Sequence, residues 1–199
     1  MKLDPLSCRS ASTELLNTTE NPRHRAILEN YLLHASCEVA GYWQYIFDSS
    51  MTVQEPVYHF RGGPYASILT GREAVMGFYE QNAIAGSNVM FSEHERLSVA
   101  DWGLSGDMLL HQLVPGSMLA AMGETADDHD AIYVISVQAM QLWPYNADGL
   151  LEGENVYIDW DNRTVTKLDP AEVITAAQAR AALDPFIPAF AKFVPDYAK

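Results

Sequence analysis

The chain has 199 residues, of which 48% are hydrophobic and 19% are charged. A chain of this length can bury one substantial core, so we expect a single main domain. It has 12 basic and 26 acidic residues, giving a formal net charge of −14, which argues against nucleic acid or an anionic membrane as the partner.

The cysteines and the hydropathy favour a soluble, cytoplasmic protein. Cys8 and Cys37 lie in different sequence contexts and do not form a disulfide framework, which indicates a reducing compartment. The N-terminus has no uninterrupted apolar segment of the kind that signal peptides carry. No apolar run approaches the roughly 18 residues that a membrane helix needs, so no membrane contact is expected.

The first part of the chain predicts an arm followed by a long helix. Residues 1–21 are polar and weakly patterned, which indicates a loose arm. Asn21-Pro22 is a helix start, with Asn as the N-cap and Pro at the first helical position. From Arg23 to about Phe47 apolar residues recur at helical spacing, so we expect an amphipathic helix with a broad buried face.

One flank of this helix carries three polar side chains, Tyr31, His34 and Glu38. We interpret His34 as a histidine at the boundary of the core that makes one hydrogen bond. A catalytic role is the alternative.

A strand and a short helix follow. Residues 52–60 have strand composition, and Pro56 cannot donate to a ladder, so this strand should lie at an edge or carry a bulge. Thr70, with Glu73 three residues later, predicts a capping box that opens a helix. Its inner face is Val75, Phe78 and Tyr79, and Gly86 is placed to end it.

The second half predicts an antiparallel meander. β-branched and aromatic residues alternate with polar ones, with turn signals between the segments. The expected strands are residues 88–100, 104–114, 131–143, 154–159 and 163–168. Residues 116–130 should form a loop, and Asp169-Pro170 with Glu172 predicts the start of a last helix over 173–183. Together these elements predict an α+β cone in which a curved sheet wraps one long and one short helix.

The end of the chain is unusually apolar. Residues 184–199 carry three phenylalanines among prolines. Such a segment should pack on its own domain or on a partner subunit. We therefore divide the chain into an arm over 1–21, a domain over 22–183 and a tail over 184–199.

Two motifs resemble a known superfamily. The segment Gly71-Arg72-Glu73-Ala74-Val75-Met76-Gly77-Phe78-Tyr79 matches a "G-x-x-A-I-x-x-F-Y" helix, and residues 153–159 match a late "G-E-x-x-Y-x-D" strand. With the order of elements, they resemble the nuclear transport factor 2-like (NTF2-like) superfamily, and within it the SnoaL-like polyketide cyclase group, over roughly residues 22–168. The resemblance implies an NTF2-like (cystatin-like) cone with an apolar pocket at one end, and a homodimer formed through the sheet. The arm, the 116–130 loop and the tail are departures that could cover the pocket mouth.

The resemblance leaves the activity open, because members include cyclases, isomerases, dehydratases, epoxide hydrolases and proteins that only bind. We expect acid/base chemistry without a cofactor or metal, acting on a small hydrophobic molecule that contains a ring. A non-catalytic binding or dimerisation module is the alternative. Epoxide hydrolysis is a third possibility, and it would need Arg61 or Arg96 between two aspartates.

Four strand residues are the candidate catalytic groups. His59 or Asp159 would be the base, and Tyr157 or His111 would donate to the developing oxyanion. Three of them have a structural alternative: His111 as a hydrogen-bonded sheet histidine, Tyr157 as a core aromatic, and Asp159 as a turn cap. The candidate binding residues are Trp43, Tyr58, Phe78, Tyr79 and Glu154.

Glu154 could instead pair with Arg72 or Arg96. The cluster Asp127-Asp128-His129-Asp130 lacks the spacing of a calcium loop, so we interpret it as a solvated turn. Alternation along a strand places His94 opposite Glu93 and Glu95, which argues against a metal site there.

Overall fold

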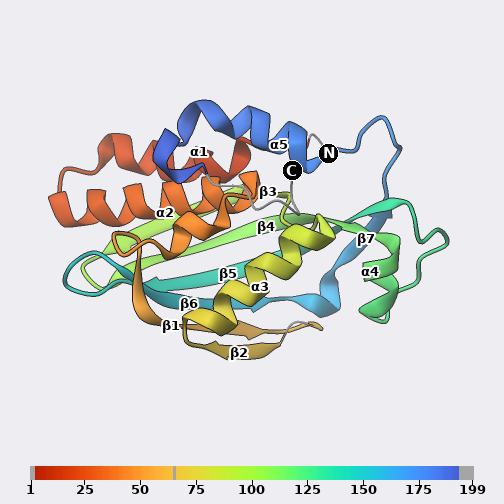
Figure 1. Ribbon diagram of the computed structural model, residues 1–199, viewed down its shortest axis with the longest axis horizontal. Helices are drawn as coiled ribbons and strands as arrows, with labels where there is room; N and C mark the ends of the chain where they lie inside the picture. The colour runs from red at the N-terminus through yellow and green to blue at the C-terminus, as the bar shows by residue number, and fades with distance from the viewer. Residues whose placement is uncertain (1–2, 65, 193–199) are drawn as a thin grey trace.

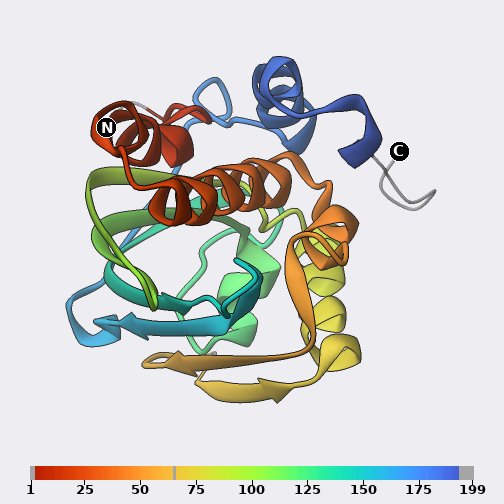
Figure 2. The ribbon, with the colours of Figure 1, turned by 90° about the vertical axis from the view of Figure 1, so that its left-hand side faces the viewer.

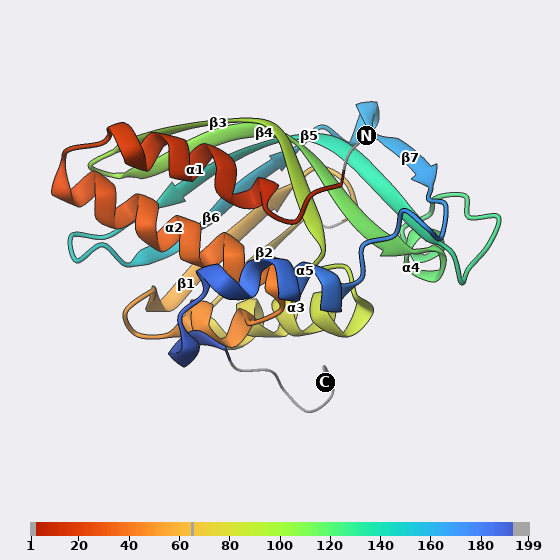
Figure 3. The ribbon, with the colours of Figure 1, turned by 90° about the horizontal axis from the view of Figure 1, so that it is seen from above.

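The computed structural model describes residues 3–64 and 66–192. Helices lie on one side of a curved sheet, and they cover its hollow face (Figures 1 and 3). The helices are α1 (Ser7–Thr18), α2 (Pro22–Ala40), α3 (Arg72–Ala85), α4 (Gly116–Ala121) and α5 (Ala176–Leu183). The strands are β1 (Thr52–Arg61), β2 (Ser67–Thr70), β3 (Met90–Ala100), β4 (Gly103–Pro115), β5 (Ile132–Pro144), β6 (Leu151–Ile158) and β7 (Thr164–Lys167).

The sheet has the strand order β2-β1-β6-β5-β4-β3, and β7 also pairs with β5. Its pairs are antiparallel except for β1 and β6, which run parallel. Figure 2 shows the strands curving round toward α2 on one side and α3 on another. This confirms the α+β cone with a curved sheet, and the five strands predicted in the second half of the chain are all present.

The predicted start of α2 is confirmed, but its predicted end is wrong. The Asn21 side chain accepts hydrogen bonds from the backbone N–H groups of Arg23 and His24. The helix ends at Ala40 because Gly41 adopts a left-handed conformation, with φ 77°. A 3₁₀ turn, Trp43–Phe47, then carries the chain toward β1.

The loose arm expected before α2 is also corrected, because residues Ser7–Thr18 form α1, which packs on α2 and β3. Arg9 Nη1 donates to Ser36 Oγ at 2.6 Å, and Ser7 Oγ accepts from the backbone N–H of Ser92 at 3.0 Å. Leu3, Leu6 and Cys8 contact the main core. Burying these apolar side chains holds a segment whose polar pattern alone does not indicate a docked helix.

Two predicted helix starts are wrong. Thr70 belongs to β2, where it pairs with Val57, and Gly71 caps α3 without a side-chain hydrogen bond. The last helix begins at Ala176, with a capping box formed by Thr175 and Gln178. The 116–130 segment is not entirely loop, because it contains α4.

The bulge predicted at Pro56 is confirmed. The pairing of β1 with β6 shifts between Thr52 and Val57, and β2 covers the outer side of β1, so β1 is not an edge strand. Gly153 sits opposite Val57 with φ 154°. A Cβ at Gly153 would lie 1.9 Å from the Val57 carbonyl oxygen, so this close approach requires glycine.

The apolar tail packs in part on the domain. Ile187 and Ala191 are buried, whereas Phe186 and Phe190 are 48% and 72% exposed. The prediction for residues 193–199 lies outside the described residues. None of the helices in the described part of the chain is long and apolar enough to span a membrane.

We predict opposite effects for alanine at two glycines. Gly153→Ala should lower the free energy of unfolding by about 2 to 4 kcal/mol, because the new Cβ must displace the β1 backbone. Gly77→Ala is the control: this helical glycine has open space around it, so alanine there should raise stability by about 0.5 to 1 kcal/mol. Urea denaturation measures both. Equal effects would contradict the close approach of β1 and β6.

Candidate functional site

A cavity of about 170 Å³ lies inside the cone, and its wall is mostly apolar. Helices α1, α2 and α3 and strands β1, β3, β4, β5 and β6 all contribute lining residues. The polar lining side chains are Tyr31, Glu38, Tyr79, Asn82, Ser87, Asn88, Ser92, Glu95, Gln112, Gln141 and Glu154. An apolar cavity with a few convergent polar groups is the usual form of a small-molecule site.

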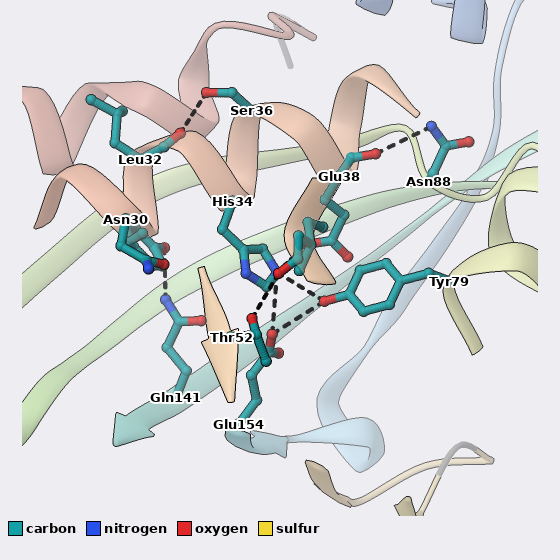
Figure 4. A network of polar contacts seen from close by, with 12 residues as sticks. Asn30, Leu32, His34, Ser36, Glu38, Thr52, Tyr79, Asn88, Gln141 and Glu154 are labelled. Atoms are coloured by element: carbon teal, nitrogen blue, oxygen red, sulfur yellow. Dashed lines mark hydrogen bonds and ion pairs between the residues drawn. The ribbon is translucent and has the colours of Figure 1, made fainter. Parts of the chain in front are cut away.

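One polar cluster centres on His34, which is completely buried in α2. Its Nε2 lies 2.9 Å from Tyr79 Oη, 3.4 Å from Glu154 Oε1 and 3.9 Å from Glu38 Oε2. Figure 4 shows His34 reaching toward Tyr79 and Glu154 from its helix. Burial lowers the pKa of His34 to about 3, so the imidazole is neutral near pH 7.

The hydrogen bonds of this cluster favour one donor-to-acceptor order, from His34 through Tyr79 to Glu154. Tyr79 Oη donates to Glu154 Oε1 at 3.2 Å. Neutral His34 has one N–H, and Nδ1 is buried without a partner. With the proton on Nε2, His34 donates to Tyr79 and leaves only an unfilled acceptor at Nδ1. His34, Tyr79 and Glu154 then form a directional chain that ends on the carboxyl group.

The two carboxyl groups near His34 have raised pKa values. Burial first, and the charge of Glu38 second, raise the pKa of Glu154 well above its ordinary value. Burial raises the pKa of Glu38 to about 7. Two acids this close do not ionise independently. The neutral form of Glu154 is therefore favoured, while Glu38, with a pKa of about 7, is poised between its two forms near pH 7.

A second polar cluster involves β3. Tyr31 Oη donates to Glu95 Oε1 at 2.6 Å and accepts from Gln141 Nε2 at 2.9 Å. Ser92 Oγ donates to the other Glu95 oxygen at 3.3 Å. Burial raises the pKa of Glu95, and the hydrogen bonds from Tyr31 and Ser92 partly offset this rise. The cavity thus has a second acidic group, separate from the pair near His34.

The structure places most of the predicted binding residues at the cavity. Trp43, Phe78, Tyr79 and Glu154 line it. Tyr58 is fully buried behind the lining, with its ring 6.2 Å from that of Tyr79. The alternative pairing of Glu154 with an arginine is not seen in the described residues.

The two predicted histidines lie on the other face of their strands. Phe60 lines the cavity, so its strand neighbour His59 points away from it. His111 lies between Leu110 and Gln112, which both line the cavity. Its Nδ1 is 2.6 Å from Ser136 Oγ, and this matches the alternative of a hydrogen-bonded sheet histidine.

Tyr157 and Asp159 also lie outside the lining. Tyr157 is 40% exposed, and the Arg61 guanidinium lies 5.2 Å from its ring centre. Asp159 is exposed and accepts a hydrogen bond from Asn162 at 2.8 Å, as expected of a turn cap. The structure does not bring the four predicted catalytic residues together, and their catalytic roles stay a prediction.

The other acidic clusters have local partners. Lys167 pairs with Asp127 and Asp128, and Arg96 forms a two-point ion pair with Asp107. Within residues 3–64 and 66–192, no group of three or more His, Cys, Asp or Glu side chains is arranged to hold a metal ion.

No protein-family model matches the sequence, and no curated protein matches it. Several solved structures are similar, and two of them have TM-scores of at least 0.50. A protein assigned as a SnoaL-like polyketide cyclase from Jannaschia sp. CCS1 shares 15% identity and a TM-score of 0.53, over 71% of this chain and 91% of that one. Bal32a, from a soil-derived mobile gene cassette, shares 10% identity and a TM-score of 0.50, over 69% of this chain and 92% of that one.

The chain has an NTF2-like fold of the SnoaL-like kind. Identities this low establish the fold and not the reaction. The reaction has to be inferred from the side chains inside the NTF2-like cone.

In the sequence, Tyr31, His34 and Glu38 share one flank of a helix, and His34 is interpreted there as a histidine at the boundary of the core, with catalysis as the alternative. Their spacing of three and four residues was the available signal, since it places them on a single face. The sequence could not show that this face closes the cavity, because that depends on how α2 crosses the sheet.

We predict that Glu38→Gln changes the pH dependence of stability. The pKa of Glu38 is about 7 in the folded protein, above its ordinary value of 4.5. Stability from this group is therefore full below about pH 4.5 and is lost as the pH rises to about 7. As the pH rises through this window, the free energy of unfolding should fall less in Glu38→Gln than in the wild type. The difference should be on the order of 2 kcal/mol.

Urea denaturation at several pH values between about 4.5 and 8 measures this difference. His34 contributes in the opposite direction, since its lowered pKa makes stability fall as the pH drops below about 6.5, but it does so in both proteins. Glu152→Gln, an exposed glutamate on β6, is the control and should leave the profile unchanged. If Glu38→Gln had the same pH dependence of stability as the wild type, the pKa of Glu38 in the folded protein would not be raised.

Proposed function

We propose that this protein is a cofactor-free acid/base enzyme that acts on a small, hydrophobic, ring-containing molecule bound in the cavity. The reaction would be a proton transfer next to a carbonyl group, as in cyclisation, isomerisation or dehydration. The observation that carries the proposal is the pair of glutamic acids with raised pKa values, facing one buried neutral histidine in an otherwise apolar cavity. Perturbed acids that share a cavity mark functional sites more often than structural ones.

Glu38 is the proposed base. A general base works best when its pKa lies near the working pH, and the pKa of Glu38 is about 7. Its side chain is 20% exposed, so it lines the cavity and still exchanges protons with solvent. This position lets the carboxylate take a proton from the substrate carbon and regain its starting state after each turnover.

Glu154, which accepts from Tyr79, is the proposed donor to the developing oxyanion. A carboxylic acid that keeps its proton can donate a hydrogen bond, and burial shifts the pKa of Glu154 well upward, which favours this neutral form. His34 donates to Tyr79 and so holds the phenol in place. Donors already fixed in a water-poor cavity stabilise charge at little reorganisation cost.

The proton balance is simple. Glu38 removes a proton from the carbon beside the carbonyl, and the electron pair moves to the carbonyl oxygen. The protonated Glu38 can then return the proton to another carbon, which is isomerisation, or to a leaving hydroxyl, which is dehydration. Attack of the enolate on a second carbonyl would close a ring, and the protonated Glu38 would return its proton to the new alkoxide. The similar Jannaschia protein, assigned as a polyketide cyclase, supports this route.

The cavity size supports a small guest. Its volume of about 170 Å³ is close to the 150 Å³ or so that suffices to bind a benzene ring in an apolar cavity. One ring therefore fits, either as the whole substrate or as the reacting part of a larger one.

We predict that the protein speeds deuterium exchange at carbons next to a carbonyl. The test incubates the protein with cyclohexanone, 2-cyclohexenone and 1-indanone in D₂O and follows the exchange by proton NMR. Glu38→Gln should lower the protein-dependent rate by about 100-fold or more, because it removes the base. Tyr79→Phe should lower it less, since Glu154 remains as a donor.

Asp159→Asn is the control variant and should exchange at the wild-type rate, because Asp159 lies outside the cavity. Loss of exchange in Asp159→Asn, with retention in Glu38→Gln, would overturn the assignment of the base. Binding of the ketones without any exchange would favour a non-catalytic binding module.

We also propose the homodimer that the fold resemblance implies. Met140 on β5 pairs with Tyr157 on β6, and they are 59% and 40% exposed, with Leu142 nearby at 40%. Exposed apolar side chains grouped on a sheet face support a contact with a second copy. Met140→Asp should convert a dimer to a monomer in sedimentation velocity experiments. Glu152→Asp, an exposed change on the same sheet, should not. A wild-type monomer would contradict this proposal.

A further inference from the structure

An irregularity in β3 turns one carboxylate into the cavity. Glu93 and Glu95 would share a face in a regular strand. The pairing of β3 with β4 shifts between Glu93 and Arg96, and His94 has φ 56°. It is the one non-glycine residue with positive φ in the described part of the chain. Glu93 Oε2 lies 3.5 Å from His111, away from the cavity, whereas Glu95 lines the cavity and binds Tyr31.

Such a backbone conformation is unfavourable for a histidine, and bulges often redirect side chains next to functional sites. The result here is a glutamate whose two oxygens accept hydrogen bonds from Tyr31 and Ser92. Burial raises the pKa of Glu95, and both bonds oppose this rise because they stabilise its ionised form. Glu95 takes no part in the proton transfer proposed above, so its position calls for a separate explanation.

The charge around the cavity has a single sign. Three lining residues are glutamates, and the lining within the described residues includes no lysine, arginine or histidine. The nearby cation Arg9 donates to Ser36 and lies over the ring of Phe186, 4.5 Å from its centre, so it is engaged outside the lining. An anionic guest would meet carboxyl groups without a compensating positive charge.

Aromatic rings supply much of the remaining wall. Seven lining side chains are aromatic. Among them, Tyr31, which holds Glu95, packs edge-on against Trp143 with 4.8 Å between ring centres. Aromatic faces attract organic cations, and the attraction is strongest where water is excluded. Aromatic rings together with a carboxylate are the usual surroundings of a bound ammonium group.

We propose that the substrate carries a cationic amine as well as its carbonyl group, and that Glu95, turned inward by the bulge at His94, is the residue that recognises this ammonium. The proposal rests on the function proposed above and names its substrate class, a ring-sized amino ketone. Glu95 selects the substrate, while Glu38 and Glu154 carry the proton chemistry.

The test compares three probes of similar shape by isothermal titration calorimetry and ligand-detected NMR. They are benzyltrimethylammonium, its neutral carbon counterpart neopentylbenzene, and the anion 3-phenylpropanoate. The wild-type protein should bind the ammonium at least about 10-fold more tightly than the neutral probe, and it should bind the anion least. Equal or tighter binding of the neutral probe would overturn the proposal, and so would failure of the ammonium to bind.

Glu95→Gln keeps the shape of the side chain and an acceptor for Tyr31, so it should fold normally. It should weaken ammonium binding at least about 10-fold and leave the neutral probe unaffected. Glu93→Gln, two residues away and facing outward, is the matched control and should bind like the wild type. Unchanged ammonium binding in Glu95→Gln would show that Glu95 only ties α2 to β3.

The ketone exchange assay separates this proposal from the one it rests on. Cyclohexanone carries no amine, so its exchange by the wild-type protein reports on the proton-transfer groups alone. Exchange without ammonium selectivity would overturn the substrate class and leave the acid/base function standing. Ammonium selectivity without exchange in the wild type would overturn the acid/base function and leave ammonium recognition by Glu95 standing.

Discussion

The buried neutral imidazole of His34 is the constraint on which the rest of the site depends. Its Nε2 faces Tyr79 from α3 and Glu154 from β6, so one atom on α2 relates both helices to the sheet. Polar groups buried in an apolar core are costly unless they are paired, and a partly paired network is worse than none. The packing that closes the cone must therefore complete this chain of hydrogen bonds, and the same packing raises the pKa of Glu154. The fold and the proposed chemistry therefore both require this hydrogen-bond chain.

Backbone irregularities place the acidic groups. Glu154 follows Gly153, whose backbone approaches Val57 too closely for any side chain, at the point where β1 and β6 change register. Glu95 follows His94, at the register shift between β3 and β4. In a regular sheet the side-chain period of two fixes which residues face inward. The two bulges break this rule next to the two strand carboxylates that line the cavity, which is where a folding compromise is expected to serve function.

The cone could be predicted from the sequence because the patterns that indicate its strands and helices involve residues close together in the chain. Period-two strands, the Asn21-Pro22 helix start and the Gly86 stop depend on residues close in the chain, and the structure confirms them. The candidate site depended on face and register, which are tertiary properties. His59 and His111 are one strand position away from residues that line the cavity, and that single step sends their side chains to the other face. Glu95 could not be found by alternation, since the bulge reverses what alternation implies.

Helix α1 shows how far the site extends along the chain. Cys8 lines the cavity and Ser7 binds Ser92, the residue that also donates to Glu95. The segment that composition describes as an arm is therefore part of the wall beside the β3 cluster. The cluster around His34 is instead built by α2, α3 and β6. Because different elements hold the two clusters, we expect that changes in α1 and β3 can alter what the cavity accepts while the proposed proton-transfer groups stay in place.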